Sequence, residues 1–395
     1  MPVIFLLALA CGVAVGNVYF PQAVLPSLAA GLDVTAQAAA PVVTATQFGY
    51  AAGIFLLVPL GDRLPHRRLI VTLLVLTGAG LVAAGAAPTL GALLAASVPV
   101  GLTTVVAPII GPMAAGLVGA DRRGVVAGTL LSGSIGGMLL SRALGGALAE
   151  RLGWRAPYLV SAGLVLGVAF LLARVLPQTV PPSAQRYPAL LAGSARLLRA
   201  EPELRRSCVY QTAVFAAFSA VWTAVALLLS GPVYGLGASA VGALALVNAG
   251  TMVCTPIAGR QVDRRGPDAV NLVCLAGAAV SALVLAAGGL GGAAGLAGLV
   301  LGTLLLDVAM QSGMVANQVR IYGLRPEARS RLNTAYMTCA YAGGATGSWL
   351  GAGAYGRAGW PGVCALVALL AGLALLRHLA HPAVRRGRRP RRRTP

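Results

Sequence analysis

The sequence contains no lysine, and only 10 of its 395 residues are acidic. Charged residues make up 10% of the chain, whereas an average soluble domain has about 25%. Hydrophobic residues make up 57%, and the mean hydropathy is +0.82. A soluble fold cannot bury so much apolar surface, so we expect a membrane protein whose main solvent is the bilayer.

Several motifs of enzymes and pumps are also missing from the sequence. Without lysine there is no GxxxxGK[ST] loop, which excludes a pump driven by ATP. The cysteines form no CxxC pair and the histidines no HExxH, so neither a metal nor a cofactor is expected. No nucleophile with a base and no pair of catalytic aspartates is evident, which disfavours a membrane-embedded enzyme. Aromatics are few and arginines lie at the ends of apolar runs, so nucleic-acid binding is not expected.

The chain consists instead of apolar runs of membrane-spanning length. A helix needs about 20 apolar residues to cross the hydrocarbon core. Twelve runs meet this requirement, roughly at 4–28, 39–60, 69–88, 91–118, 125–148, 156–176, 208–230, 236–258, 269–289, 294–320, 332–354 and 360–380. We therefore predict an all-α polytopic protein of twelve transmembrane helices. Its parts are a six-helix bundle at 1–176, a linker with a possible amphipathic helix at 177–207, a second bundle at 208–380 and a tail at 381–395.

The loops between these runs alternate in arginine content. If the N-terminus is cytoplasmic, the outside loops hold only Arg151, Arg155 and Arg357, and the other loop arginines lie inside. The positive-inside rule therefore predicts a multi-pass protein of the cytoplasmic membrane with both termini in the cytoplasm. The arginine-rich tail is expected to support this topology and to attract anionic lipids.

Two landmarks recur along the chain with nearly the same shift. The pair Asp62-Arg63 recurs 201 residues later as Asp263-Arg264, and the Gly-Trp pair at 153–154 recurs 206 residues later at 359–360. This indicates an internal duplication of a six-helix unit. Parallel repeats of this kind build transporters with a substrate site near the midplane between the halves, and a receptor or scaffold would not explain the duplicated loops.

The stretches VPLGDRLPHRR and AGRQVDRRG resemble the loop signature G-x-x-x-D-R-x-G-R-[KR] of the major facilitator superfamily. The second copy matches at Gly259, Asp263, Arg264 and Gly266. The first copy keeps Asp62, Arg63, Arg67 and Arg68 but has valine, proline and histidine at three other motif positions. The resemblance covers essentially the whole chain, and it implies a carrier that works as a monomer.

In that family the loop closes the cytoplasmic side when the cavity faces outward, which gives these residues an expected role as a gate. Asp62 can face the positive N-terminus of a helix from the other half. The arginines can pair with carboxylates at loop ends, and Asp121 is the expected partner. The alternative is that the charges only set topology, although acidic residues contribute little to topology.

A second resemblance concerns the fifth run. Proton-coupled exporters of the superfamily often carry G-x8-G-x3-G-P-x2-G-G there, and the matching glycines are Gly128, Gly137, Gly145 and Gly146. Serine and Arg142 replace the G-P pair. The small residues allow close helix packing. The resemblance implies proton-coupled efflux of a drug, sugar or related metabolite, with proton-coupled uptake and uniport as alternatives.

Two charges lie deep inside predicted spans, Arg142 in the fifth and Asp307 in the tenth. Intramembrane charges are unfavourable and usually functional. Asp307, Gln311 and Gln318 share one helix face, which should line a cavity. In the family, spans one, four, seven and ten line that cavity, which implies further substrate contacts at Asn17, Tyr19, Gln22, Gln211 and Trp222, with Gln47 and Asn248 nearby.

We expect Asp307 to exchange the proton, since burial and a nearby cation act on a carboxyl group in opposite senses. One alternative is a permanent Asp307–Arg142 ion pair that holds the halves together. Another is that Arg142 binds an anionic substrate and Asp307 only positions it.

Overall fold

The computed structural model describes residues 2–116, 118–119, 122–177, 186–325 and 328–381, and every regular element within these ranges is helical. The sequence predicts this result, because lipid offers no hydrogen-bond partner to the backbone. A helix satisfies its N–H and C=O groups internally, so apolar runs of this length fold as helices.

The N-terminal half of the chain forms eight α-helices and one short 3₁₀ helix within the described residues. They are α1 (Pro2–Gly31), α2 (Ala36–Ala39), α3 (Pro41–Leu56), η1 (Val58–Asp62), α4 (His66–Gly85), α5 (Leu90–Thr103), α6 (Val106–Gly116), α7 (Arg123–Leu152) and α8 (Arg155–Val175). Threonine side chains cap two of these helices: Thr35 accepts from the Ala38 backbone N–H at α2, and Thr89 accepts from Ala92 at α5.

The rest of the described chain begins with a helix that precedes the second bundle. This helix is α9 (Tyr187–Ala200), and the elements after it are α10 (Pro202–Ser230), α11 (Ala238–Val247), η3 (Asn248–Val253), α12 (Cys254–Ala286), η4 (Ala287–Leu290), α13 (Gly292–Tyr322) and α14 (Arg329–Ala380). Helix α9 buries Leu190 and Leu197 and exposes arginines on its other side, as an amphipathic helix does.

Ten helices of the described chain are long and apolar enough to cross a membrane, not the twelve expected. Two pairs of predicted spans are joined, because α12 and α14 each continue through a predicted break. Helix α14 has 52 residues. This corresponds to about 78 Å at the α-helical rise, more than twice a hydrocarbon core of about 30 Å. The chain therefore bends inside both helices, at Gly266 (φ +80°) and at Gly359 (φ +60°), in a region of φ that favours glycine.

Two other predicted spans are interrupted. The run predicted at 91–118 is divided into α5 and α6 around Thr104. The run predicted at 236–258 consists of α11, the 3₁₀ turn η3 and the start of α12. Such interruptions in membrane helices require neighbouring groups to satisfy the freed backbone bonds.

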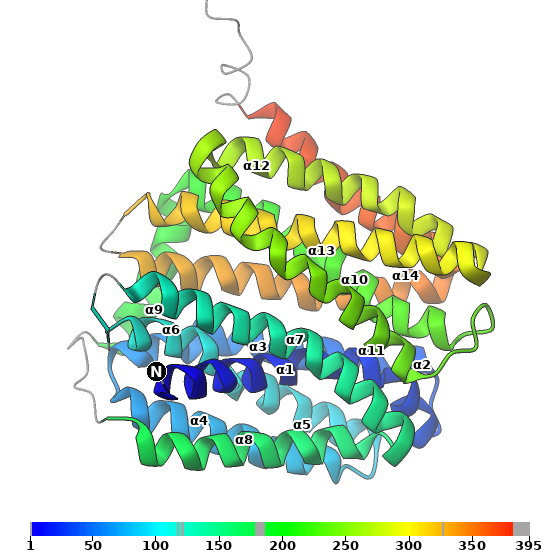
Figure 1. Ribbon diagram of the computed structural model, residues 1–395, viewed down its shortest axis with the longest axis horizontal. Coiled ribbons are helices and arrows are strands. Elements are labelled where there is room, and N and C mark those ends of the chain that lie inside the picture. The colour runs from blue at the N-terminus through cyan, green and yellow to red at the C-terminus, as the bar shows by residue number, and fades with distance from the viewer. Residues whose placement is uncertain (1, 117, 120–121, 178–185, 326–327, 382–395) are drawn as a thin grey trace, which may run out of the picture.

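The two halves lie side by side, with their helices running in similar directions (Figure 1). Within the first half α1 packs on α7 and α4 on α8, and within the second α10 packs on α14 and α12 on α13. Between the halves the main contacts are α3 with α14 and α7 with α11. Helix α9 lies at one end of the molecule and α2 at the other (Figure 1).

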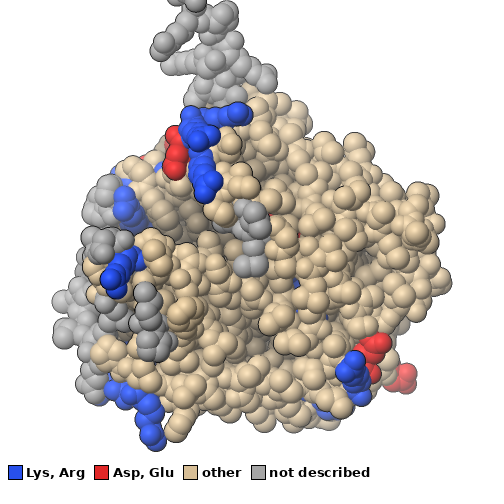
Figure 2. All heavy atoms as spheres, viewed as in Figure 1, with Lys and Arg blue, Asp and Glu red and all other residues tan. Residues whose placement is uncertain are grey.

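The surface carries many large apolar side chains. Phe170, Leu283 and Leu369 are each more than half exposed. On the face drawn in Figure 2 the charged side chains gather at the two ends of the helices, and the middle carries almost none. An apolar belt between two charged ends is the surface of a multi-pass membrane protein.

Close helix contacts depend on three of the four predicted packing glycines. A Cβ at Gly137 would lie 2.1 Å from the Gly12 carbonyl oxygen on α1, and one at Gly146 would lie 2.4 Å from the Ala238 carbonyl oxygen on α11. Gly145 packs against Phe20. The prediction was wrong for Gly128, where a Cβ would meet open space, since this glycine lies on the exposed face of α7.

Candidate functional site

The two intramembrane charges lie on opposite halves, Arg142 on α7 and Asp307 on α13, and both are fully buried. Burying an ionised side chain is unfavourable unless other groups replace its water. The surroundings of these two residues therefore identify the candidate site.

Arg142 is surrounded by one amide and three aromatic rings. Its Nε and Nη2 groups both donate to Oε1 of Gln22 on α1, at 3.0 and 2.7 Å. Its guanidinium carbon lies 4.2 Å from the ring centre of Trp222, 4.9 Å from that of Tyr19 and 5.4 Å from that of Phe218. Cation–π attraction is strong when the cation is desolvated, so these rings replace part of the lost hydration.

Trp222 connects Arg142 to Asp307. Its indole Nε1 donates to Oδ1 of Asp307 at 3.1 Å, while its ring faces Arg142. Among the described ion pairs none joins Asp307 directly to Arg142. The two charges are thus coupled through a tryptophan of the second half.

Three buried polar atoms of Arg142, Asp307 and Gln22 have no hydrogen-bond partner in the described chain. They are Nη1 of Arg142, Oδ2 of Asp307 and Nε2 of Gln22. Unpaired buried polar groups are rare, and they raise the free energy of a protein unless a ligand or ion uses them. We therefore name Tyr19, Gln22, Arg142, Trp222 and Asp307 the central polar group.

Two hydrogen-bond chains join the halves beside the central polar group. The Tyr19 hydroxyl donates to the Tyr341 hydroxyl of α14 at 3.4 Å. Ser348 of α14 donates to Oε1 of Gln47 on α3 at 3.0 Å, and Thr223 of α10 donates to Ser348 at 3.1 Å. Gln47 is therefore a contact between the halves.

Three residues that were predicted to contact the substrate instead form hydrogen bonds between helices of one half. Asn17 donates to Thr104 at 3.2 Å, which ties α1 to the break between α5 and α6. Asn248 donates to Thr303 at 3.1 Å, and Gln311 donates to Thr251 at 2.9 Å, and both tie α13 to η3. These bonds stabilise the interrupted backbone at Thr104 and in η3.

The remaining predicted contacts lie apart from the central polar group. Gln211 on α10 is buried, its Nε2 atom has no described partner, and it lines a small cavity with Asn271 and Asn317. Gln318 is half-buried on α13, about two turns beyond Gln311. The three residues predicted to share one face of α13, Asp307, Gln311 and Gln318, therefore lie in different surroundings.

The first copy of the predicted gate loop contacts the other half. Asp62 ends η1, which packs against α14, and its carboxylate is attracted to Arg331 in the first turn of that helix. Arg67 donates to the Ala173 carbonyl of α8, in its own half. Arg63 and Arg68 are exposed, and Asp121 lies outside the described residues.

The second copy of the loop does not form such a contact. Asp263 and Arg264 are exposed, and neither has a hydrogen bond or ion pair within the described ranges. Gly259 lies within α12, and Gly266 forms its bend. In this arrangement Asp263 and Arg264 therefore make no described contact with the first half, and the gate role of the second copy stays a prediction.

A cluster of ion pairs near the second loop was not anticipated. Arg206 of α10 lies 3.2 Å from Glu203 and 2.6 Å from Asp268. Arg320 of α13 also pairs with Asp268, and its Nε lies 3.6 Å from Glu203. The sequence suggested only a topological role for both arginines, since the shared partner Asp268 lies on another helix, α12.

Sequence reasoning also missed a contact at the opposite end. Glu150, near the end of α7, accepts a 2.9 Å hydrogen bond from the Ser239 backbone N–H in the first turn of α11. A Cβ at Gly237 would lie 2.7 Å from this carboxylate, which would then have to shift. A carboxylate at a helix N-terminus is favourable, and this one joins the two halves.

Comparison with known proteins assigns the fold. A family model described as Major Facilitator Superfamily matches residues 6–302. A putative uncharacterized transporter of Escherichia coli (strain K12), YgaY, is 35% identical over 361 residues, which are 91% of each chain. The probable transporter SCO4007 of Streptomyces coelicolor is 35% identical over 91% of this chain and 83% of its own.

Solved structures agree at the level of the fold. A mutant of the nucleoside transporter NupG superposes with a TM-score of 0.77 over 96% of this chain and 98% of its own, at 13% identity. A bacterial homolog of the lysosomal transporter Spinster, in an inward-facing and occupied conformation, gives a TM-score of 0.66 at 14% identity, over 95% of this chain and 93% of its own.

Proposed function

Since the chain belongs to the Major Facilitator Superfamily, we propose that it is a secondary active transporter of the cytoplasmic membrane. It moves a small molecule by alternating access, and the direction we propose is proton-coupled efflux. The chain then crosses the membrane twelve times, with the bends in α12 and α14 as loops and both termini in the cytoplasm. On this orientation α9 and Asp62 lie inside, and Glu150 and Arg357 lie outside.

The observation that carries the proposal is the central polar group. Arg142 and Asp307 come from different halves, so a relative movement of the halves changes the surroundings of both charges. Burial and the positive charge of Arg142 act on the protonation of a carboxyl group in opposite senses. A change in their balance between two conformations would load or release a proton at Asp307, and coupling requires such a difference.

The substrate is proposed to bind beside the same residues. The unpaired Nη1 of Arg142 and Nε2 of Gln22 offer donors, and the rings of Tyr19, Phe218 and Trp222 offer an apolar face. This combination accepts a small amphiphilic molecule with an acceptor group, such as a drug, a sugar or a related metabolite. No cofactor is required, and a monomer contains the whole path.

The test uses the purified protein in liposomes with an imposed pH gradient. A panel of drugs, sugars, nucleosides and amino acids is added while the internal pH is followed. We expect that at least one compound dissipates the gradient with the wild type and not with Asp307→Asn. Gln311→Leu serves as the matched control, because Gln311 lies one turn away on α13 and outside the central polar group.

The outcomes distinguish the alternatives. Equal, pH-silent transport by the wild type and Asp307→Asn would contradict proton coupling through Asp307 and indicate uniport. A proton flux in the same direction as the substrate would indicate uptake by symport. Loss of transport in Gln311→Leu as well would mean that α13 packing, and not the carboxylate, limits transport.

A further inference from the structure

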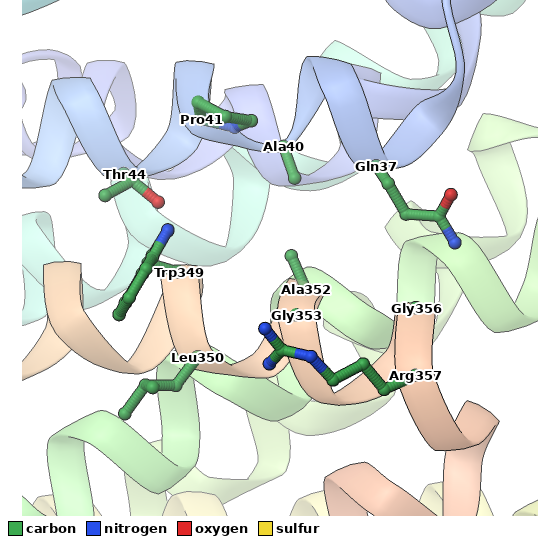
Figure 3. A pocket seen from close by; sticks show the side chains of 10 residues that line it. All are labelled: Gln37, Ala40, Pro41, Thr44, Trp349, Leu350, Ala352, Gly353, Gly356 and Arg357. Carbon is green, nitrogen blue, oxygen red and sulfur yellow. The ribbon is translucent and has the colours of Figure 1, made fainter.

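A cleft lies between α3 and α14 at the end of the molecule that contains α2 (Figure 3). Its volume is about 390 Å³ and it opens to the outside of the protein. Its walls are mostly apolar, with Pro41 on one side and Trp349 and Leu350 on the other. None of its residues belongs to the central polar group, so the transport site does not explain it.

One charged side chain reaches into this cleft. Figure 3 shows the guanidinium of Arg357 extending along α14 toward the middle of the cleft. The guanidinium passes beside Gly353, where Nη1 lies 3.6 Å from the position that a Cβ would take. Arg155, at the same end of the molecule, differs, because it donates to the Ala87 carbonyl and stacks on Trp154. Arg357 has no hydrogen bond or ion pair with any residue that the structure describes.

Two further side chains complete the polar part of the cleft. Gln37 lies above Gly356, the neighbour of Arg357 in α14. The Thr44 hydroxyl, next to Trp349, is buried without a hydrogen-bond partner in the described chain. The cleft therefore has a cationic group near its middle, mostly apolar walls and one unpaired hydroxyl beside Trp349.

We propose that this cleft binds a phospholipid with an anionic headgroup. The headgroup phosphate lies on the guanidinium of Arg357, because a guanidinium binds phosphate oxygens through two parallel hydrogen bonds. An acyl chain lies along Pro41, Trp349 and Leu350. Trp349 is 62% exposed, and tryptophan is enriched at the level of lipid headgroups. The inference goes beyond the proposed transport function and uses the proposed orientation only to assign the lipid to the outer leaflet.

A lipid in this position would touch both halves of the protein. The cleft is formed by α3 of the first half and α14 of the second, and its shape changes when the halves move. A ligand shifts a conformational equilibrium by the difference in its affinity for the two states. Anionic lipid is therefore expected to favour the arrangement seen here.

The test measures quenching of Trp349 fluorescence by brominated lipids. The full-length protein is placed in phosphatidylcholine vesicles that contain an equal mole fraction of brominated phosphatidylglycerol or brominated phosphatidylcholine. The Trp349 signal is the difference between the wild type and Trp349→Phe, and the other tryptophans are buried. We expect phosphatidylglycerol to bind about fivefold more tightly than phosphatidylcholine.

Matched variants separate a built site from general charge attraction. Arg357→Gln should remove the preference, whereas Arg151→Gln, which deletes the same charge from the end of α7, should keep it. Asp307→Asn should also keep it, so a failed transport assay and a failed lipid assay remain distinguishable. Melting temperatures of all variants show whether they are folded.

Three results would overturn the proposal. One is equal quenching by the two brominated lipids in the wild type, which would indicate ordinary annular lipid. Another is loss of the preference in Arg151→Gln as well as in Arg357→Gln. The third is displacement of phosphatidylglycerol by an excess of soluble glycerol 3-phosphate, which would make a free phosphate ester the occupant.

Discussion

At the scale of single residues, the site depends on how one buried arginine is stabilised. Arg142 lies in a fully buried position and donates both of its described hydrogen bonds to a single oxygen of Gln22. The aromatic rings around it contribute attraction but no acceptor. Gln22 is therefore the one described hydrogen-bond acceptor of this buried guanidinium.

Gln22→Leu is expected to lower the stability of the protein. The substitution leaves two buried N–H groups of a charged side chain without an acceptor, at a cost of about 3 kcal/mol. The melting temperature in detergent micelles should fall by several degrees. Gln22→Glu keeps the acceptor and adds a negative charge beside Arg142, so its melting temperature should stay close to that of the wild type. Equal melting temperatures of the two variants would disprove this role.

At the scale of helices, packing of α7 requires glycine at some positions and not at others. Gly137 faces the α1 backbone, whereas Gly128 faces open space. Gly137→Ala should destabilise the protein by about 1–3 kcal/mol through overpacking. Gly128→Ala, the same change two turns and a half earlier, should be neutral or stabilise the helix by about 0.5–1 kcal/mol. Thermal unfolding of the two variants, side by side, tests the prediction; similar losses would contradict it.

The contact of α7 with α11 gives a second prediction at this scale. Glu150→Gln removes a charge from the α11 N-terminus, where a carboxylate is favourable. The fraction of molecules in which the outer ends of α7 and α11 are separated should therefore rise. Double electron–electron resonance between labels at Leu152→Cys, at the end of α7, and Leu236→Cys, just before α11, reports the separation, since both positions are exposed. An unchanged distance distribution would show that the glycine contacts alone hold these ends together.

At the scale of the whole molecule, the distribution of loop arginines predicts how the protein is oriented in the membrane. The arginines of the predicted inside loops far outnumber the three assigned outside, Arg151, Arg155 and Arg357. Green fluorescent protein fused to the C-terminus should therefore fluoresce in bacterial cells, because it matures only in the cytoplasm. Alkaline phosphatase inserted at Gly235, in a predicted outside loop, should be active. An inactive phosphatase together with a dark C-terminal fusion would reverse the proposed topology.

The sequence by itself predicted that the protein lies in a membrane, that its fold is helical and that a six-helix unit is repeated. It also identified the two intramembrane charges on which the proposed site depends. Each follows from a one-dimensional property: the length of apolar runs, the spacing of landmarks, or the free energy of a charge inside a membrane. Tyr19, Gln22, Trp222, Arg142 and Asp307 were predicted, and the structure brings them into one group.

Only the tertiary structure decided which partners these residues have. Asn17, Asn248 and Gln311 have the composition of substrate contacts, yet they bond to other helices of their own half. Phe218, Glu150 and the cleft at Arg357 became visible only when helices distant in sequence were packed together. Hydrogen bonds, cation–π contacts and clefts act over a few ångströms between chain segments up to about three hundred residues apart, so local sequence patterns do not specify them.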